Sequence, residues 1–244
     1  MKFFVLFLIF PLFIVRAEEI LIDDFSSYKV DQFPADEESG IRWGIVSSNP
    51  FETDQYHVRK EGDNQYLEGV ADFKREATYG KAPEDVKVTR IVKAHRFEFK
   101  DGTPFLRWKW RVHEFPAGSQ EDVQYLNDSA AAVLVTFMTP SRAYPTIQYI
   151  WSRSVPAGEV FPNPAFNEDF PTYFKIMRSG SAEDSQLWVE EEVNVFEDFK
   201  KIFGEKYADY LPVIGISVLT DANNTQSRAH GEYDDFYRSS RAKY

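Results

Sequence analysis

Residues 106–112 read LRWKWRV, and residues 130–137 read AAAVLVTF. In the first stretch, large apolar side chains alternate with Arg and Lys, which is the period-two pattern of a strand with one buried face. The second stretch is almost entirely apolar and is typical of a central strand covered on both faces. Together they predict a protein built mainly of β-sheet.

Similar β-rich runs occur along most of the chain, separated by turn residues. They lie at residues 66–71, 91–99, 147–151, 173–177, 187–189, 213–219 and 230–238. Residues 196–203 differ, because their apolar side chains follow helical spacing and Gly204 is a suitable C-cap. Roughly ten strands with one late helix predict an all-β fold, a two-sheet antiparallel β-sandwich.

The first 17 residues, MKFFVLFLIFPLFIVRA, are typical of a secretory signal peptide, with one Lys, an apolar run and small or apolar residues before Ala17. The apolar run is interrupted by Pro11 and is shorter than the roughly 20 residues that a membrane span needs. We therefore expect a signal peptide at 1–17 and one domain at 18–244. The product is expected to be exported, periplasmic or secreted, and not membrane-spanning after cleavage.

The composition excludes several classes of protein. With 28 Lys+Arg and 39 Asp+Glu the net charge is −11, and there is no Cys. Loss of Lys2 and Arg16 with the leader makes the charge −11 − 2 = −13. An acidic chain without a basic cluster argues against nucleic acid as a partner. The absence of Cys excludes disulfides, thiolate metal sites and a lipoprotein anchor.

A cationic stripe stands out against this acidity. Arg107, Lys109 and Arg111 share one face of the expected strand 106–112, about 7 Å apart in succession. The stripe is a candidate binding surface for an anionic ligand such as an acidic sugar. Pairing with carboxylates on neighbouring strands is the alternative that we favour.

Trp151 ends an expected strand just before a loop rich in Pro and Gly, where an aromatic ring is well placed to stack on a sugar; closing the core is its more ordinary role. Glu191 lies in an acidic run of an expected strand. Because sandwich glycosidases use paired carboxylates as acid and nucleophile, Glu191 with Asp128 or Asp221 is the candidate catalytic pair. A solvated strand face is the simpler interpretation of the acidic run.

Hard oxygen ligands gather near both ends of the expected domain, where the first and last strands of a sandwich commonly lie side by side. The candidate metal ligands are Asp23, Asp24, Asp234 and Asp235. The loop from Asp221 resembles a calcium loop in its oxygen spacing, but Gln226 occupies the position where an EF-hand requires Gly. No cofactor is predicted, and a structural calcium ion is the alternative that these acids leave open.

Local catalytic motifs are absent: the chain has no phosphate-binding glycine loop, no G-x-S-x-G and no H-E-x-x-H. The four histidines are scattered, and we expect each to be an ordinary strand or surface residue. They are His57, His95, His113 and His230.

An ordered series of runs resembles one family. The runs are LRWKWRV, AAAVLVTF, YIWSRSVPAGEVFPNP from residue 149, WVEEEVNVFEDFKKIFG from residue 188, GISVLTDANNT from residue 215 and GEYDDFYR from residue 231. Over about residues 20–238 the chain is similar to exported bacterial proteins of domain-of-unknown-function family 3047. The resemblance implies a jelly-roll or concanavalin-like sandwich and assigns no activity.

The resemblance also implies a set of matching polar and aromatic positions. They are Asp128, Trp151, Ser179, Gly180, Trp188, Glu191, Asn194, Asp198, Asp221, Asn224 and Thr225. The chain departs from the family pattern at Asn127, Val193 and Asn223, where the family typically has an acid, an Arg and an Asp.

The sequence therefore predicts a binding module for a glycan or a cell-envelope component, with Trp151, Asp128, Glu191 and Asn224 at the ligand groove. Two alternatives remain. One is a glycoside hydrolase or polysaccharide lyase of jelly-roll fold, and the other is a purely structural envelope protein.

Overall fold

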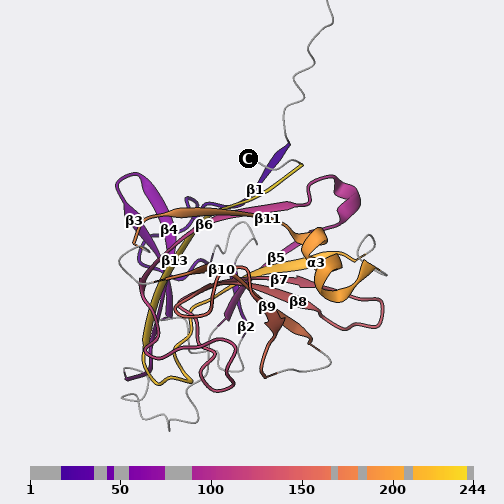
Figure 1. Cartoon of the computed structure of the whole chain (residues 1–244). Helices are drawn as coiled ribbons and strands as arrows, with labels where there is room; N and C mark the ends of the chain where they lie inside the picture. The colour runs from indigo at the N-terminus through magenta and orange to yellow at the C-terminus, as the bar shows by residue number, and fades with distance from the viewer. Residues whose placement is uncertain are drawn as a thin grey trace, which may run out of the picture.

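A computed structural model describes residues 18–35, 43–46, 55–74, 90–165, 170–180, 186–205 and 211–240 (Figure 1). The expected signal peptide, residues 1–17, lies outside these ranges. Among the described residues, no helix is long and apolar enough to cross a bilayer.

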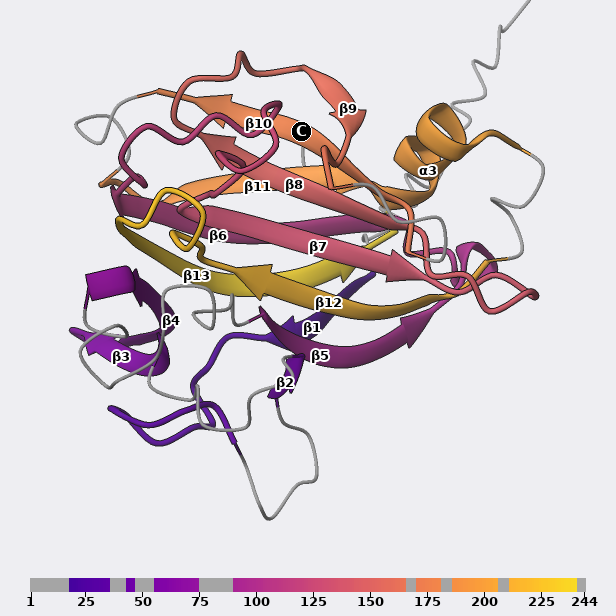
Figure 2. The same cartoon turned by 90° about the horizontal axis from the view of Figure 1, so that it is seen from below.

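The strands form two sheets packed face to face, so the predicted β-sandwich is confirmed. The six-stranded sheet has the order β11 (Val189–Asn194), β6 (Phe105–Glu114), β13 (Arg228–Ser239), β4 (Asn64–Asp72) and β3 (Tyr56–Glu61). Its sixth strand, β1 (Glu19–Asp23), lies off this path and pairs with β13. The seven-stranded sheet has the order β2 (Trp43–Val46), β5 (Arg90–Phe97), β12 (Val213–Leu219), β7 (Ala131–Phe137), β8 (Thr146–Ser152), β10 (Thr172–Ser179), β9 (Val160–Pro162). Figure 2 views the molecule from the side of the seven-stranded sheet.

The pairing is antiparallel except between β8 and β10, which run parallel with Thr146 opposite Thr172. The first and last described strands lie side by side, as the sequence predicts: β1 pairs with β13, and Glu19 is opposite Ser239. β13 therefore lies in the interior of its sheet, between β4 and β6 as well as beside β1.

The alternation in residues 106–112 produces the core of the sandwich. Trp108 and Trp110 are fully buried between the sheets, with their rings 5.4 Å apart in an edge-to-face arrangement. Both rings reach across to aromatic residues of β8, because Trp108 packs on Tyr149 and Trp110 packs on Trp151. Burying such large rings contributes much of the hydrophobic free energy of folding.

The α-helix α3 (Val195–Phe203) confirms the helix predicted at 196–203. Asn194 caps its start by accepting a hydrogen bond from the backbone N–H of Glu197 (3.1 Å). Gly204 ends it with φ of 91° and donates to the carbonyl of Lys200 (3.0 Å). The helix packs Phe199 against Phe137 of β7, with ring centroids 4.6 Å apart.

Candidate functional site

The outer face of the seven-stranded sheet carries a groove of about 360 Å³, lined by residues of β5, β12, β7, β8 and β10 and the loops beside them. Figure 2 shows how these strands lie in the sheet. Its floor is hollowed by small residues: Ala94 of β5 lies opposite Gly215 of β12. Hydroxyl groups of Thr136, Thr146 and Ser217 add polar atoms to this floor. The face is therefore neither flat nor purely apolar.

Two aromatic residues line the groove beside this floor. Tyr144 and Phe170 are stacked, with ring centroids 5.6 Å apart and planes 12° from parallel. Phe170 is 53% exposed. An exposed ring beside a polar floor is suited to ligands that have both hydroxyl groups and apolar faces.

Arg90, at the start of β5, also lines the groove. Burial lowers the pKa of its guanidinium group from the usual value, while the nearby Tyr56 acts in the opposite direction. Within the part of the chain that the structure describes, no carboxylate forms an ion pair with Arg90. The guanidinium group of Arg90 therefore lines the groove without a carboxylate partner among the described residues.

The predicted cationic stripe lies elsewhere, on the outer face of the six-stranded sheet, and its charges are paired. The pairs are Arg107 with Glu19 (2.9 Å) and Glu190 (3.7 Å), Lys109 with Asp235 (2.7 Å), and Arg111 with Glu61 (3.0 Å) and Glu232. The arrangement is the one favoured by the sequence, in which neighbouring strands supply the carboxylates.

Trp151 and Arg178 line a small hollow of about 250 Å³, together with Val189 of β11. Trp151 is only 4% exposed and the Arg178 guanidinium lies 5.6 Å from its ring centroid. Arg178 also pairs with Glu191, which accepts a longer hydrogen bond from Trp110 Nε1 (3.3 Å). Burial raises the pKa of Glu191, and the charge of Arg178 opposes that effect. The ring is thus covered rather than offered to a sugar.

Asp128, Asp221 and Asn224 come together where the segment before β7 meets the loop that follows β12. Asp128 is fully buried and accepts hydrogen bonds from the backbone N–H of Asn224 (3.1 Å) and from the backbone N–H and hydroxyl of Thr225 (2.7 Å each). Asn224 is exposed and its amide donates to Asn127 (2.6 Å). Several positions implied by the resemblance therefore converge, and their contacts order a loop.

The three candidate catalytic acids occupy two different environments. Glu191 is engaged by Arg178 and Trp110, whereas Asp128 and Asp221 lie beside each other. Burial, and then the charge of Asp128, raise the pKa of Asp221 well above its usual value. A glycosidase needs two carboxylates facing one cleft at about 5–10 Å, and the contacts of Glu191 are not shared with either Asp.

The four candidate metal ligands take separate partners. Asp23 accepts from Lys93 and other donors, Asp24 from the hydroxyl of Ser26 (2.6 Å), Asp234 from the amide of Asn64 (2.8 Å), and Asp235 pairs with Lys109. Among the described residues, these carboxylates do not form a group of three within 4.8 Å of one another. Their proximity along β1 and β13 therefore does not bring their oxygens to one point.

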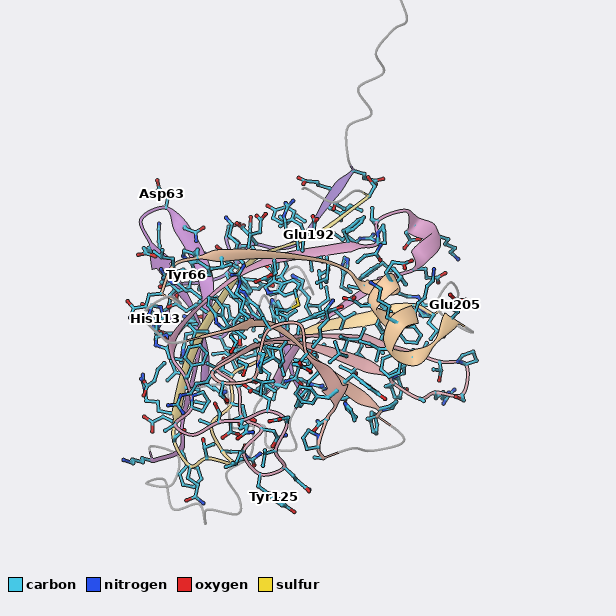
Figure 3. All side chains as sticks on the ribbon, viewed as in Figure 1. Asp63, Tyr66, His113, Tyr125, Glu192 and Glu205 are labelled. Carbon is cyan, nitrogen blue, oxygen red and sulfur yellow. The ribbon has the colours of Figure 1, made fainter. Side chains whose placement is uncertain are left out.

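Sequence reasoning missed a compact cluster on β6 and β13. His113, His230 and Glu232 bring their ligand atoms within 4.8 Å of one another, on the flank where Figure 3 labels His113. Burial lowers the pKa of His230, but the hydrogen bonds and charges of Glu232 and Glu68 have a larger effect and raise this pKa to about 8. Burial acts against ionised Glu232, yet its basic neighbours lower its pKa to about 2.

The groove was missed too, because its lining comes from five strands whose pairing is not local in sequence. A weak signal existed in the threonines that begin β8 and β10, Thr146 and Thr172, each following an aromatic residue two positions earlier. A buried acid, Glu121, was also missed; burial raises its pKa to about 7, against the hydrogen bond from Ser152.

Comparisons with known proteins give a family and two structural likenesses. A family model described as "Protein of unknown function (DUF3047)" matches residues 43–237. A family 11 carbohydrate-binding module of Clostridium thermocellum is 8% identical with a TM-score of 0.44, covering 91% of this chain and 95% of that one. A family 12 xyloglucanase from Bacillus licheniformis is 9% identical with a TM-score of 0.39, covering 91% and 98%. No curated protein sequence matches the chain.

Proposed function

The chain belongs to the DUF3047 family, whose description names no activity, and from the geometry of its groove we propose that it is an exported module that binds a glycan or another cell-envelope component. The observation that carries this proposal is the groove on the outer face of the seven-stranded sheet, with the stacked pair Tyr144 and Phe170 beside a hydroxyl-bearing floor.

The dimensions of the groove support a small or extended ligand. Its volume of about 360 Å³ lies within the range of roughly 300–1,000 Å³ that is usual for ligand sites. The groove crosses five strands, and strands lie about 4.8 Å apart, so it spans on the order of 19 Å of the sheet. A short oligosaccharide, with hydroxyl groups at its edges and C–H groups on its ring faces, matches such a surface.

Replacing Phe170 by alanine is expected to weaken binding about tenfold, because an aromatic contact contributes roughly 1.4 kcal/mol. The measurement is isothermal titration calorimetry with a panel of soluble neutral and acidic oligosaccharides. Acidic members are included because Arg90 has no described counter-ion in the groove.

The matched control is Tyr125→Ala, which removes another exposed aromatic ring, 72% exposed, from a loop that does not line the groove (Figure 3). This variant should bind like the parent protein. If no member of the panel binds, or if both variants lose affinity equally, the groove is not the binding site.

Export makes a separate prediction. Expressed from its full sequence in a bacterial host, the protein should be recovered outside the cytoplasm with Glu18 as its first residue, because cleavage is expected after Ala17. Cell fractionation followed by intact-mass measurement gives the answer. Recovery of cytoplasmic protein that retains residues 1–17 would contradict export while leaving the groove proposal intact.

A further inference from the structure

The histidine–glutamate cluster on the outer face of the six-stranded sheet is built by two paired strands. β6 contributes His113, and β13 contributes His230 and Glu232. The register shifts between His230 and Gly231, so that His230 lies opposite Glu114 and the two imidazole rings come within 4.5 Å of each other, centroid to centroid. Because Glu232 lies opposite Arg111 and Gly231 opposite Val112, His230 and His113 are neighbours across the strand pair even with the shift.

We propose that His113, His230 and Glu232 form a binding site for a divalent transition-metal ion, Zn²⁺ in particular. Two imidazole nitrogens and a carboxylate oxygen are a ligand set that zinc uses widely. The site lies on the opposite sheet from the groove and is independent of the proposed ligand binding.

The spacing of the ligand atoms fits such an ion. Nε2 of His113 lies 3.1 Å from Oε2 of Glu232, and Nε2 of His230 lies 3.6 Å from Oε1 of the same carboxylate. Tetrahedral zinc holds nitrogen and oxygen at roughly 2.0–2.1 Å, which places neighbouring ligand atoms about 3.4 Å apart. All three ligand atoms lie within 4.8 Å of one another, so the side chains must move closer together to hold one ion.

Both imidazoles also have a nitrogen available. The Nε2 atoms of His113 and His230 are buried, yet neither has a hydrogen bond of acceptable geometry among the described residues. Each lies close to a carboxylate oxygen, at 3.1 Å for His113 and Glu232 and at 3.3 Å for His230 and Glu68, but without the alignment of a hydrogen bond. A buried nitrogen so placed can take a ligand or a bound water instead. Here two such nitrogens lie beside one carboxylate, that of Glu232.

Surrounding groups orient the carboxylates as the outer shell of a metal site does. Arg111 donates from Nε to Glu232, and Arg59 donates from Nε to Oε2 of Glu68 (2.7 Å). The other oxygen of Glu68, Oε1, lies 3.3 Å from Nε2 of His230, which makes Glu68 a second carboxylate and a fourth group beside the cluster. The His113 side chain is 30% exposed, so the cluster is open to solvent on one side.

An ion-pair cluster is the competing account. Protonated imidazoles held between Glu68 and Glu232 would satisfy the same distances without any metal, and Arg111 already supplies one positive charge. The two accounts differ in one measurable respect, since only the first requires stoichiometric metal binding.

The test uses the protein expressed from its full sequence and purified without a polyhistidine tag. Titration with Co²⁺, followed by its visible absorption, and calorimetric titration with Zn²⁺ should each give one ion per chain. The variants His113→Gln and His230→Gln should each weaken Zn²⁺ binding by more than about 100-fold, because each removes one of three protein ligands.

The matched control is His95→Gln, on β5 of the other sheet, which should bind Zn²⁺ like the parent. Circular dichroism verifies that each variant is folded. If the intact protein binds neither ion, the cluster is an ion-pair network; if His95→Gln lowers affinity as much as the two cluster variants, the ion binds elsewhere. Either outcome overturns the proposal without bearing on the groove.

Discussion

Replacing Lys93 by methionine is expected to lower the free energy of unfolding by about 3–5 kcal/mol, because it leaves a buried carboxylate without its cation. Lys93 and Asp23 pair inside the sandwich, where both side chains are less than one tenth exposed. Asp23 also accepts from Tyr28 OH (2.9 Å), Trp43 Nε1 (2.9 Å) and the backbone N–H of Phe25 (3.0 Å). These donors remain in the variant, but none of them carries a charge.

Urea denaturation of Lys93→Met measures the loss, with Lys100→Met as control. Lys100 pairs with Glu98 on the surface, 75% exposed, so its replacement should leave the midpoint unchanged. The double variant Asp23→Asn/Lys93→Met should lose less than the sum of the single variants, since it leaves no unpaired charge. If Lys93→Met is as stable as the parent, the buried carboxylate of Asp23 does not depend on the charge of Lys93.

Asp128→Asn is expected to cost about 3 kcal/mol, the second large effect. The carboxylate of Asp128 accepts three hydrogen bonds from Asn224 and Thr225, and hydrogen bonds to a charged acceptor contribute roughly 1.5–3 kcal/mol each. An amide has only one acceptor oxygen, so its NH₂ group would face a donor. Thermal and urea denaturation both measure this loss.

Asp221 lies beside Asp128, but its replacement by asparagine is expected to have the opposite effect on stability. Relative to the parent protein, Asp221→Asn should gain stability as the pH rises. Because burial and the charge of Asp128 raise its pKa well above the usual value, folded Asp221 keeps a proton that the unfolded chain releases. The stability from that proton is fully present below the unfolded pKa and is lost as the pH rises through the folded one. Asparagine cannot ionise, so the variant should become more stable than the parent on the alkaline side.

Urea midpoints between about pH 5 and 9 compare the two variants. Burial raises the pKa values of Glu121 and Asp234 to about 7, so these groups also change stability over this pH range. They do so in the variant and in the parent alike, and the difference between the two proteins therefore isolates Asp221. If Asp221→Asn loses as much stability as Asp128→Asn at every pH, Asp221 does not keep its proton in the folded protein.

The local elements of the fold could be predicted because each depends on a short pattern. Alternation across residues 106–112 predicts which side chains of β6 enter the core, and Trp108 and Trp110 are fully buried. Asn194 and Gly204 bound the helix through contacts within one turn. The strand predicted at 187–189 was placed too early, since β11 covers Val189–Asn194, and the predicted runs did not include β1, β2, β3 or β9.

The candidate site could not be predicted to the same extent, because strand pairing decides it. Thr146 and Thr172 share the groove through a parallel register, and His113 meets His230 through the antiparallel pairing of β6 and β13. A pattern along the sequence identifies polar residues such as Asp128, but not that backbone N–H groups of a distant loop are its partners. Burial of Trp151 likewise depends on Arg178, which belongs to another strand.

The interior position of β13 has a consequence for the order of folding events. Its three partners, β1, β4 and β6, all precede it by long stretches of chain, and such distant contacts form slowly. Until residues 228–239 are available, these partners have open edges and cannot assemble into the six-stranded sheet. A polypeptide threaded from its N-terminal end through a narrow channel would thus complete its six-stranded sheet only after this strand had emerged on the far side.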